Sequence, residues 1–171
     1  RGIGYRFSVA AVSAIGKSKS AVTAVKTAFA AAAQGTLDVN DAPVIGGLST
    51  TTGATVVSDL LTYPTPSAKM LLDQGTTFAS VTDSDSTDFS GGSLRVSITL
   101  NKNAAKDALT IRNVGTAAGQ VNVTGNTVKV GSTTIGTFTG GTGADDLVVT
   151  LNASATPATV AALVSAIEFS N

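Results

Sequence analysis

Two short runs of oxygen-bearing side chains are the residues of this chain whose type and spacing could do chemistry. One run spans residues 38–41 and the other residues 83–88. Carboxylates two positions apart repel one another, and Ca2+, which takes about six to eight oxygen ligands, relieves that repulsion. The residues predicted to bind calcium are Asp38, Asn40, Asp41, Asp83, Asp85 and Asp88. Asp, Asn and Ser also form ordinary turns, so two solvated turns are the alternative interpretation.

The composition argues against most enzyme chemistry. The 171 residues include no Cys and no His, which excludes thiol and imidazole nucleophiles and histidine-ligated metals within this chain. Glu168 is the only Glu among the 11 acidic residues, and it lies in an apolar context near the C-terminus, so a two-carboxylate glycosidase site is not indicated. We therefore predict that the protein is not an enzyme. No run reaches the roughly 20 apolar residues of a membrane-spanning helix.

Charge divides the chain into two parts. Residues 1–37 contain five basic residues and no acid, whereas residues 38–171 contain six basic and eleven acidic residues, so the two parts carry +5 and −5 and cancel. Few aromatic residues accompany the basic ones, and no nucleic-acid partner is expected. The split instead predicts that the basic N-terminal arm, residues 1–37, docks on an acidic body, its own or a neighbour's.

The body reads as a series of short β-strands. Apolar and polar residues alternate over 94–100, which predicts a strand with one buried face. Gly125-Asn126 lies between two apolar strand patterns and predicts a tight hairpin. Further strands are expected at 109–111, 133–138 and 147–151. Strands at this spacing are typical of a β-sandwich.

One helix is expected near the C-terminus. Thr156-Pro157 provides a hydroxyl cap followed by a proline at the first helical position, and apolar residues then recur at helical spacing. The pattern predicts a helix over residues 157–166, followed by an extended segment through Phe169.

Residues 38–171 resemble the cadherin-like (VCBS-type, bacterial immunoglobulin-like) calcium-associated repeat of large bacterial adhesins and other secreted surface proteins. The matching segments, in chain order, are 38–44, 71–73, 81–86, 89–94, 109–113, 135–143, 147–152 and 167–171. The resemblance implies an extracellular, all-β, immunoglobulin/cadherin-like sandwich with a structural or adhesive role. It also implies calcium near the module junction, held by Asp38, Asn40 and Asp41 of the linker motif and by Asp83 and Asp85 of the body.

The ends of the chain depart from this family pattern. In such repeats the segment corresponding to 167–171 is followed by a β-hairpin, whereas here a similar pattern stands at the N-terminus. We predict that the arm supplies a strand or hairpin that the sandwich over 38–171 lacks, because an incomplete sheet leaves unpaired backbone groups. The arm residues predicted to form the subunit interface are Tyr5, Phe7, Val9 and Val12.

Three other interpretations of the arm stay open. It could dock within its own chain, or mark a boundary inside a longer tandem protein. Residues 20–34 also fit a helical stripe, because Ala is the best helix former and Ser20 and Gly35 could cap the ends. In that case only residues near 4–14 would form the added strand.

These patterns lead to two functional hypotheses. The first is a secreted structural subunit of a filament, surface layer or matrix, which forms a homo-polymer head-to-tail by β-strand complementation with calcium at its junctions. The second is an adhesin repeat that binds a glycan or a host surface.

Overall fold

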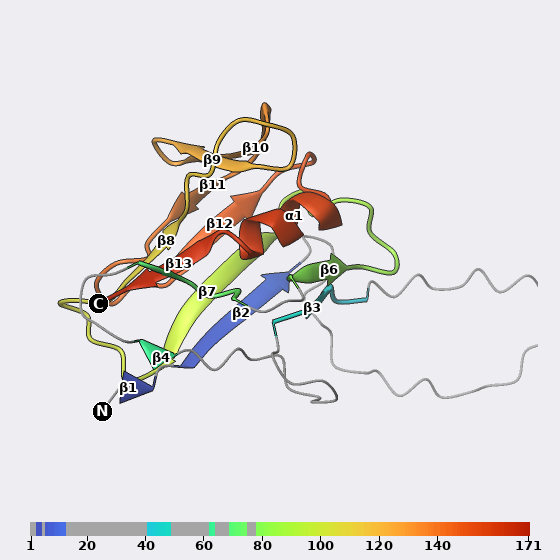
Figure 1. Cartoon of the computed structure of the whole chain (residues 1–171). Helices are drawn as coiled ribbons and strands as arrows, with labels where there is room; N and C mark the ends of the chain where they lie inside the picture. The colour runs from blue at the N-terminus through green and yellow to red at the C-terminus, as the bar shows by residue number, and fades with distance from the viewer. Residues whose placement is uncertain (1–2, 5, 13–40, 49–61, 64–68, 75–77) are drawn as a thin grey trace, which may run out of the picture.

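The protein is mostly β-structure with one short helix (Figure 1). The computed structural model describes residues 3–4, 6–12, 41–48, 62–63, 69–74 and 78–171. The strands of the N-terminal half are β1 (Ile3–Gly4), β2 (Arg6–Val12), β3 (Val44–Gly46), β4 (Thr62–Tyr63), β5 (Met70–Leu71) and β6 (Ser80–Thr82). The remaining elements are β7 (Ser93–Leu100), β8 (Ala108–Ile111), β9 (Val121–Thr124), β10 (Thr127–Val130), β11 (Thr133–Thr139), β12 (Leu147–Leu151), α1 (Pro157–Val164) and β13 (Ile167–Ser170).

The strands pair in antiparallel sheets. The largest sheet has six strands in the order β2-β7-β12-β11-β10-β9, and a second has three strands in the order β5-β13-β8. Two short ribbons, β1-β4 and β3-β6, complete the pairing among the described residues. The prediction of an all-β fold with one helix near the C-terminus is therefore confirmed at this coarse level.

A single apolar core lies between the six-stranded sheet and a second layer made of the three-stranded sheet and α1 (Figure 1). Leu94 and Val149 enter it from the large sheet, Phe169 from the small one and Leu163 from the helix, and each of these side chains has no exposed surface. The alternation predicted for β7 is seen in its burial, because Leu94, Val96 and Ile98 face the core while Arg95 is exposed.

The predicted hairpin turn and the predicted start of the helix are both present, because each depends on the conformation and hydrogen bonding of a few neighbouring residues. The β9–β10 hairpin turns at Gly125, whose φ of 58° costs glycine little. Helix α1 begins after Thr156 with a capping box: the Thr159 amide donates to the Thr156 hydroxyl and the Thr156 amide donates to the Thr159 hydroxyl over 2.9 Å. The helix ends at Val164, two residues earlier than predicted; beyond it the Ala166 amide donates to the Leu163 carbonyl over 3.0 Å, and the Ala166 carbonyl accepts the amide of Arg112 beside β8.

The N-terminal strand lies at the edge of the six-stranded sheet. β2 pairs with β7 along its whole length, so in the single chain the arm strand docks on its own body (Figure 1). The strand predicted near residues 4–14 is confirmed as β2. Residues 13–40 lie outside the described residues, and so does the choice between hairpin and helix over 20–34.

Among the described residues, no helix has both the length and the apolar character needed to cross a membrane.

Candidate functional site

The start of the body meets the loop after β6 through side-chain oxygens. The amide of Asp41 donates to Asp85 Oδ2 over 2.8 Å, and the Ser84 hydroxyl donates to Asp41 Oδ2 over 2.9 Å. Immediately beyond these contacts β3 pairs with β6, with Val44 opposite Thr82. The antiparallel ribbon therefore brings together two acidic segments about 40 residues apart in the chain.

Asp83 organises the second of these segments. Its Oδ1 accepts the amides of Asp85 and Ser86 over 3.2 and 3.1 Å, which closes a tight turn. Its Oδ2 is buried and has no hydrogen-bond partner. A buried carboxylate oxygen without a partner is costly, and a cation or a bound water relieves that cost.

The electrostatics of this junction favour an ionised Asp85. The Asp41 amide is the main cause that holds the pKa of Asp85 below its ordinary value, and the contact with Asp83 adds to it. A carboxyl group with a lowered pKa stays charged at neutral pH, which is the form that binds a hard cation.

Not every predicted calcium ligand belongs to this junction. Asp88 accepts the amide of Ser90 over 2.9 Å in a separate turn. Asp38 and Asn40 lie outside the described residues. Within the described part of the chain, no three carboxylates gather closely enough to form a complete metal-binding group. Hydrogen bonds from backbone amides connect Asp41 to Asp85 and Asp85 to Asp83; these three residues, which fall short of such a group, are called the junction cluster.

Three of the four predicted interface residues lie on β2. Phe7 pairs with Ile98, Val9 with Val96 and Val12 with Ser93. Val9 is half-buried and packs against the core. Tyr5 lies outside the described residues. The β2 positions thus add a sixth strand to a sheet whose neighbouring strand, β7, is already part of the core.

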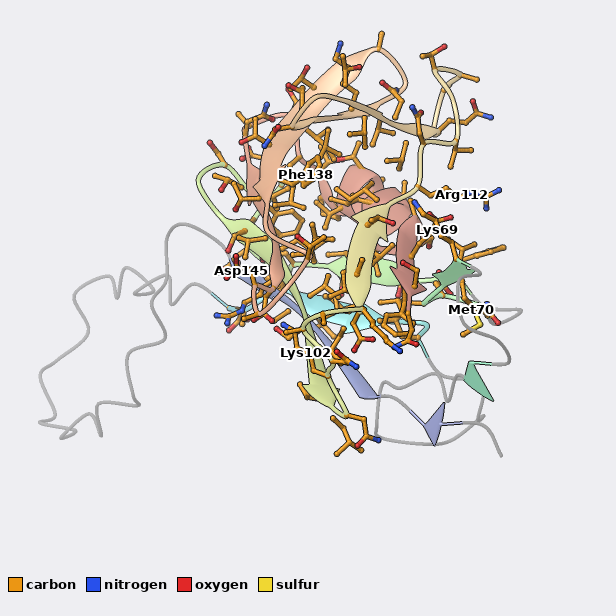
Figure 2. The ribbon with its side chains drawn as sticks, turned by 90° about the vertical axis from the view of Figure 1, so that its left-hand side faces the viewer. Lys69, Met70, Lys102, Arg112, Phe138 and Asp145 are labelled. Carbon is orange, nitrogen blue, oxygen red and sulfur yellow. The ribbon has the colours of Figure 1, made fainter. Side chains whose placement is uncertain are left out.

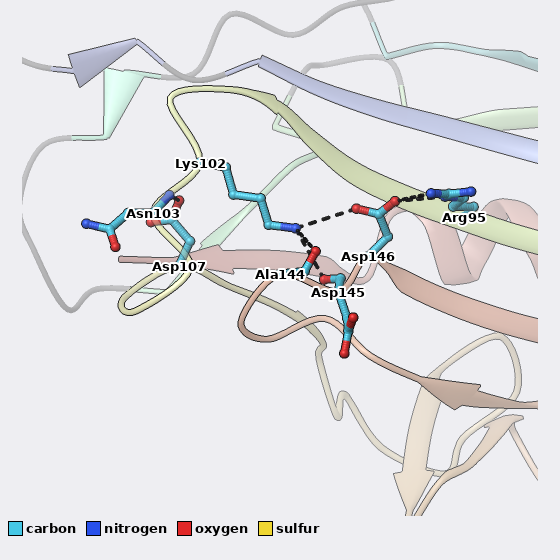
Figure 3. A network of polar contacts seen from close by, with 7 residues as sticks. All are labelled: Arg95, Lys102, Asn103, Asp107, Ala144, Asp145 and Asp146. Carbon is cyan, nitrogen blue, oxygen red and sulfur yellow. Dashed lines mark hydrogen bonds and ion pairs between the residues drawn. The ribbon is translucent and has the colours of Figure 1, made fainter.

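A second polar network was not predicted from the sequence. Lys102 Nζ lies 2.8 Å from the carbonyl oxygen of Ala144 and 3.6 Å from Asp146 Oδ1, and Arg95 donates to Asp146 Oδ2 from Nε over 2.8 Å (Figure 3). The Ser97 hydroxyl, followed by Arg95 and Lys102, holds the pKa of Asp146 below its ordinary value. The Asp145 carboxylate points away from Lys102 in Figure 3. This network ties the end of β7 to the turn before β12.

Two other carboxylates join distant segments. Asp73 is 3% exposed, and its Oδ2 accepts the Ala79 amide over 2.9 Å and the Ser165 hydroxyl over 2.5 Å. Its Oδ1 is buried without a hydrogen-bond partner. On the outer face of the small sheet, Lys69 and Arg112 flank Glu168 at 3.7 and 3.9 Å, and Figure 2 shows both cations on the same side of the molecule. Neither arrangement has a sequence signal, because the partners are far apart in the chain.

Comparison with known proteins finds no matching family model, no matching curated protein and no matching solved structure.

Proposed function

We propose that the protein is a structural subunit of an extracellular filament, surface layer or matrix, with an immunoglobulin/cadherin-like sandwich as its body. Copies assemble head-to-tail because β2 of one copy completes the six-stranded sheet of the next. The observation that supports this most directly is the position of β2. It is an edge strand, it pairs with β7 over seven residues, and it is joined to the body only through residues 13–40.

Strand exchange between copies preserves these contacts. A β2 strand makes the same backbone hydrogen bonds with β7 whether it comes from its own chain or from another. The difference in free energy therefore depends on the connecting segment and on protein concentration rather than on new contacts. Because each copy both donates a strand and accepts one, the contact is heterologous and does not need to close.

An empty β7 edge would favour such an exchange. β7 contributes Leu94, Val96 and Ile98 to the core, and their exposed fractions are 0%, 0% and 7%. Without β2, this strand would present a row of unpaired backbone groups, which is the usual template for pairing with another chain.

We propose calcium at the junction cluster as the stiffening element. Asp41, Asp83 and Asp85 would hold the ion, and the buried, unpartnered Oδ2 of Asp83 fits that role. Ca2+ would offset two of the three negative charges that these neighbouring carboxylates carry. Asp41 is the first described residue after the segment that joins β2 to the body. An ion there would fix the direction in which that segment leaves.

Cysteine trapping tests the exchange, since the chain has no Cys of its own. Ser8 and Ser97 are Cα partners across β2 and β7, and paired Cα atoms at about 4.5–5.5 Å lie within disulfide range. Chains carrying only S8C and chains carrying only S97C are mixed in denaturant, refolded together and oxidised. We expect disulfide-linked heterodimers, identified by mass spectrometry of the linked peptides.

The control for this trap is S8C mixed with S132C, because Ser132 is exposed in the distant turn between β10 and β11. A heterodimer yield from S8C with S97C no higher than this control would contradict the proposal. In that case the double variant S8C/S97C would form only an intrachain disulfide.

One observation favours adhesion to a neutral glycan as a second candidate function. The strand register aligns a row of hydroxyls across five neighbouring strands, on the face away from the core. The row consists of Thr124, Thr127, Thr137, Thr150 and Ser93. Neighbouring strands lie about 4.8 Å apart, and this distance sets the spacing of the residues in the row. A neutral polysaccharide, which carries hydroxyls along its whole length, is a ligand of matching chemistry.

Retention on insoluble cellulose and chitin tests this second candidate. We expect the wild-type chain to be retained, T137K to be lost from the bound fraction, and T116K to be retained, since Thr116 is an exposed loop residue outside the row. A wild-type chain that both polysaccharides fail to retain would rule the candidate out.

A further inference from the structure

The arm strand contacts a second partner beyond β7. Residues 3–4 form β1, which pairs with β4 so that Ile3 is opposite Tyr63 and Gly4 is opposite Thr62. Only residue 5 separates β1 from β2. The arm therefore changes partner within one residue, from β7 to a segment about 30 positions earlier in the sequence.

The backbone is irregular where this change occurs. The register of β2 against β7 shifts between Arg6, which is opposite Leu100, and Phe7, which is opposite Ile98, so β7 has one extra residue at this point. A bulge bends the strand that carries the extra residue, here β7, and increases the local twist of the pair. Here it lies at the point where the arm leaves β7 and turns toward β4 (Figure 1).

Among the described residues, the only strand that pairs with β4 is β1. The backbone groups that β4 offers to a sheet are therefore satisfied by the arm. β4 is followed, after residues 64–69, by β5, which pairs with Glu168 and Phe169 of β13 in the small sheet. Through β2 the arm thus contacts the large sheet, and through β1 it contacts the segment that leads into the small one.

We propose that the docking site for the arm is composite, made of β7 and β4, and that residues 3–12 of a second copy occupy it in the assembled protein. This inference rests on the proposed strand exchange and names a second half of its acceptor site. The arm is chosen as the occupant because its described residues, 3–4 and 6–12, fill both halves within the single chain. Any arm supplied by another copy would meet both halves in the same order.

The consequence is that arm binding orders β4. A two-residue strand has few backbone contacts of its own, and β4 gains a ladder only when β1 is present. Residues 62–63 therefore form a strand only when the arm is bound, and their backbone contacts with β1 help to hold the arm in place.

A second cysteine trap tests the composite site in trans. Chains carrying G4C and chains carrying T62C are mixed, refolded and oxidised beside the S8C and S97C mixture. We expect heterodimers from both mixtures. Heterodimers from S8C with S97C but none from G4C with T62C would overturn the composite site and leave the strand exchange standing. If neither mixture gives heterodimers, both proposals are wrong.

Hydrogen exchange of the full chain measures the contribution of β4. A variant that lacks residues 1–4 loses β1 but keeps β2, and a variant that lacks only residues 1–2 keeps both strands. We expect the amides of residues 7–12 to exchange about tenfold faster in the first variant, because one or two net hydrogen bonds are lost. The second variant should match the wild type, and β12 should be unaffected in both. Unchanged exchange of residues 7–12 after removal of residues 1–4 would overturn the inference.

Discussion

Gly141 and Leu109 join the two sheets through their backbones: the Leu109 amide donates to the Gly141 carbonyl over 2.7 Å. A Cβ at residue 141 would lie only 2.3 Å from the Leu109 carbonyl oxygen, and Gly141 has a φ of 89°. The turn between β11 and β12 can therefore approach β8 only because residue 141 has no side chain. This contact holds β8 of the small sheet against the turn between β11 and β12 of the large sheet.

Replacing Gly141 should destabilise the fold strongly. G141A combines an unfavourable positive φ with a clash against backbone, and we expect it to lower the free energy of unfolding by about 3 kcal/mol or more. G143A is the control, because Gly143 also has a positive φ, of 65°, but its Cβ would meet nothing within 4 Å. That variant should lose about 1 kcal/mol. Urea denaturation compares the two, and equal losses would show that the close contact with Leu109 does not matter.

Calcium should stabilise the native protein through the junction cluster. A ligand that binds only the folded state, at about 100 times its dissociation constant, adds about 2.7 kcal/mol. We expect the melting temperature of the wild type to rise with Ca2+ and to fall back with chelator. The double variant D83N/D85N should lose this rise, whereas D88N should keep it, because Asp88 caps a separate turn. A rise that survives in D83N/D85N would place the ion elsewhere, and no rise in the wild type would remove calcium from the proposal.

Acid should weaken the network around Asp146. Its pKa is lower in the folded chain than in the unfolded one, so the stabilisation is fully present above the ordinary aspartate pKa of about 3.9 and is lost as the pH falls through the folded value. D146N should cost about 1 kcal/mol at pH 7, and the difference from wild type should shrink below about pH 4. D145N is the control, because its carboxylate points away from Lys102. A D146N deficit that does not change with pH would contradict this account.

The Asp73 side chain should contribute to the free energy of unfolding mainly as a hydrogen-bond acceptor, and its negative charge should contribute less. D73A removes the acceptor of the Ala79 amide and the Ser165 hydroxyl, and we expect a loss of about 2–4 kcal/mol in the free energy of unfolding. D73N keeps an oxygen for both donors and replaces only the oxygen without a partner, so it should lose much less. Chemical denaturation at pH 7 distinguishes them. If D73N were as unstable as D73A, the unpartnered oxygen would need a cation or another donor.

The elements of the fold that follow from local chemistry could be predicted from the sequence. Alternation over 94–100 predicted β7, the Gly125 turn predicted the β9–β10 hairpin, and the Thr156 cap predicted the start of α1. The candidate site was predictable only in part. The acidic spacing at 83–85 marked the turn, but Ser84 as the donor to Asp41 depends on the β3–β6 pairing. The Lys102–Asp146 network and Asp73–Ser165 had no local pattern, because their members are 44 and 92 positions apart.

The sequence by itself determined that the protein is rich in short strands, that it has one capped helix, and that its acids are almost all aspartates gathered in turns. These properties depend on backbone preferences and on side-chain periodicity over a few neighbouring residues. The tertiary structure alone decided that β2 lies against β7, that β1 lies against β4, and which carboxylates meet at the junction. Pairing two distant strands costs the entropy of closing the loop between them, and it gains free energy from the surface that the strands bury. Which strands pair depends on the balance of these two quantities over the whole chain.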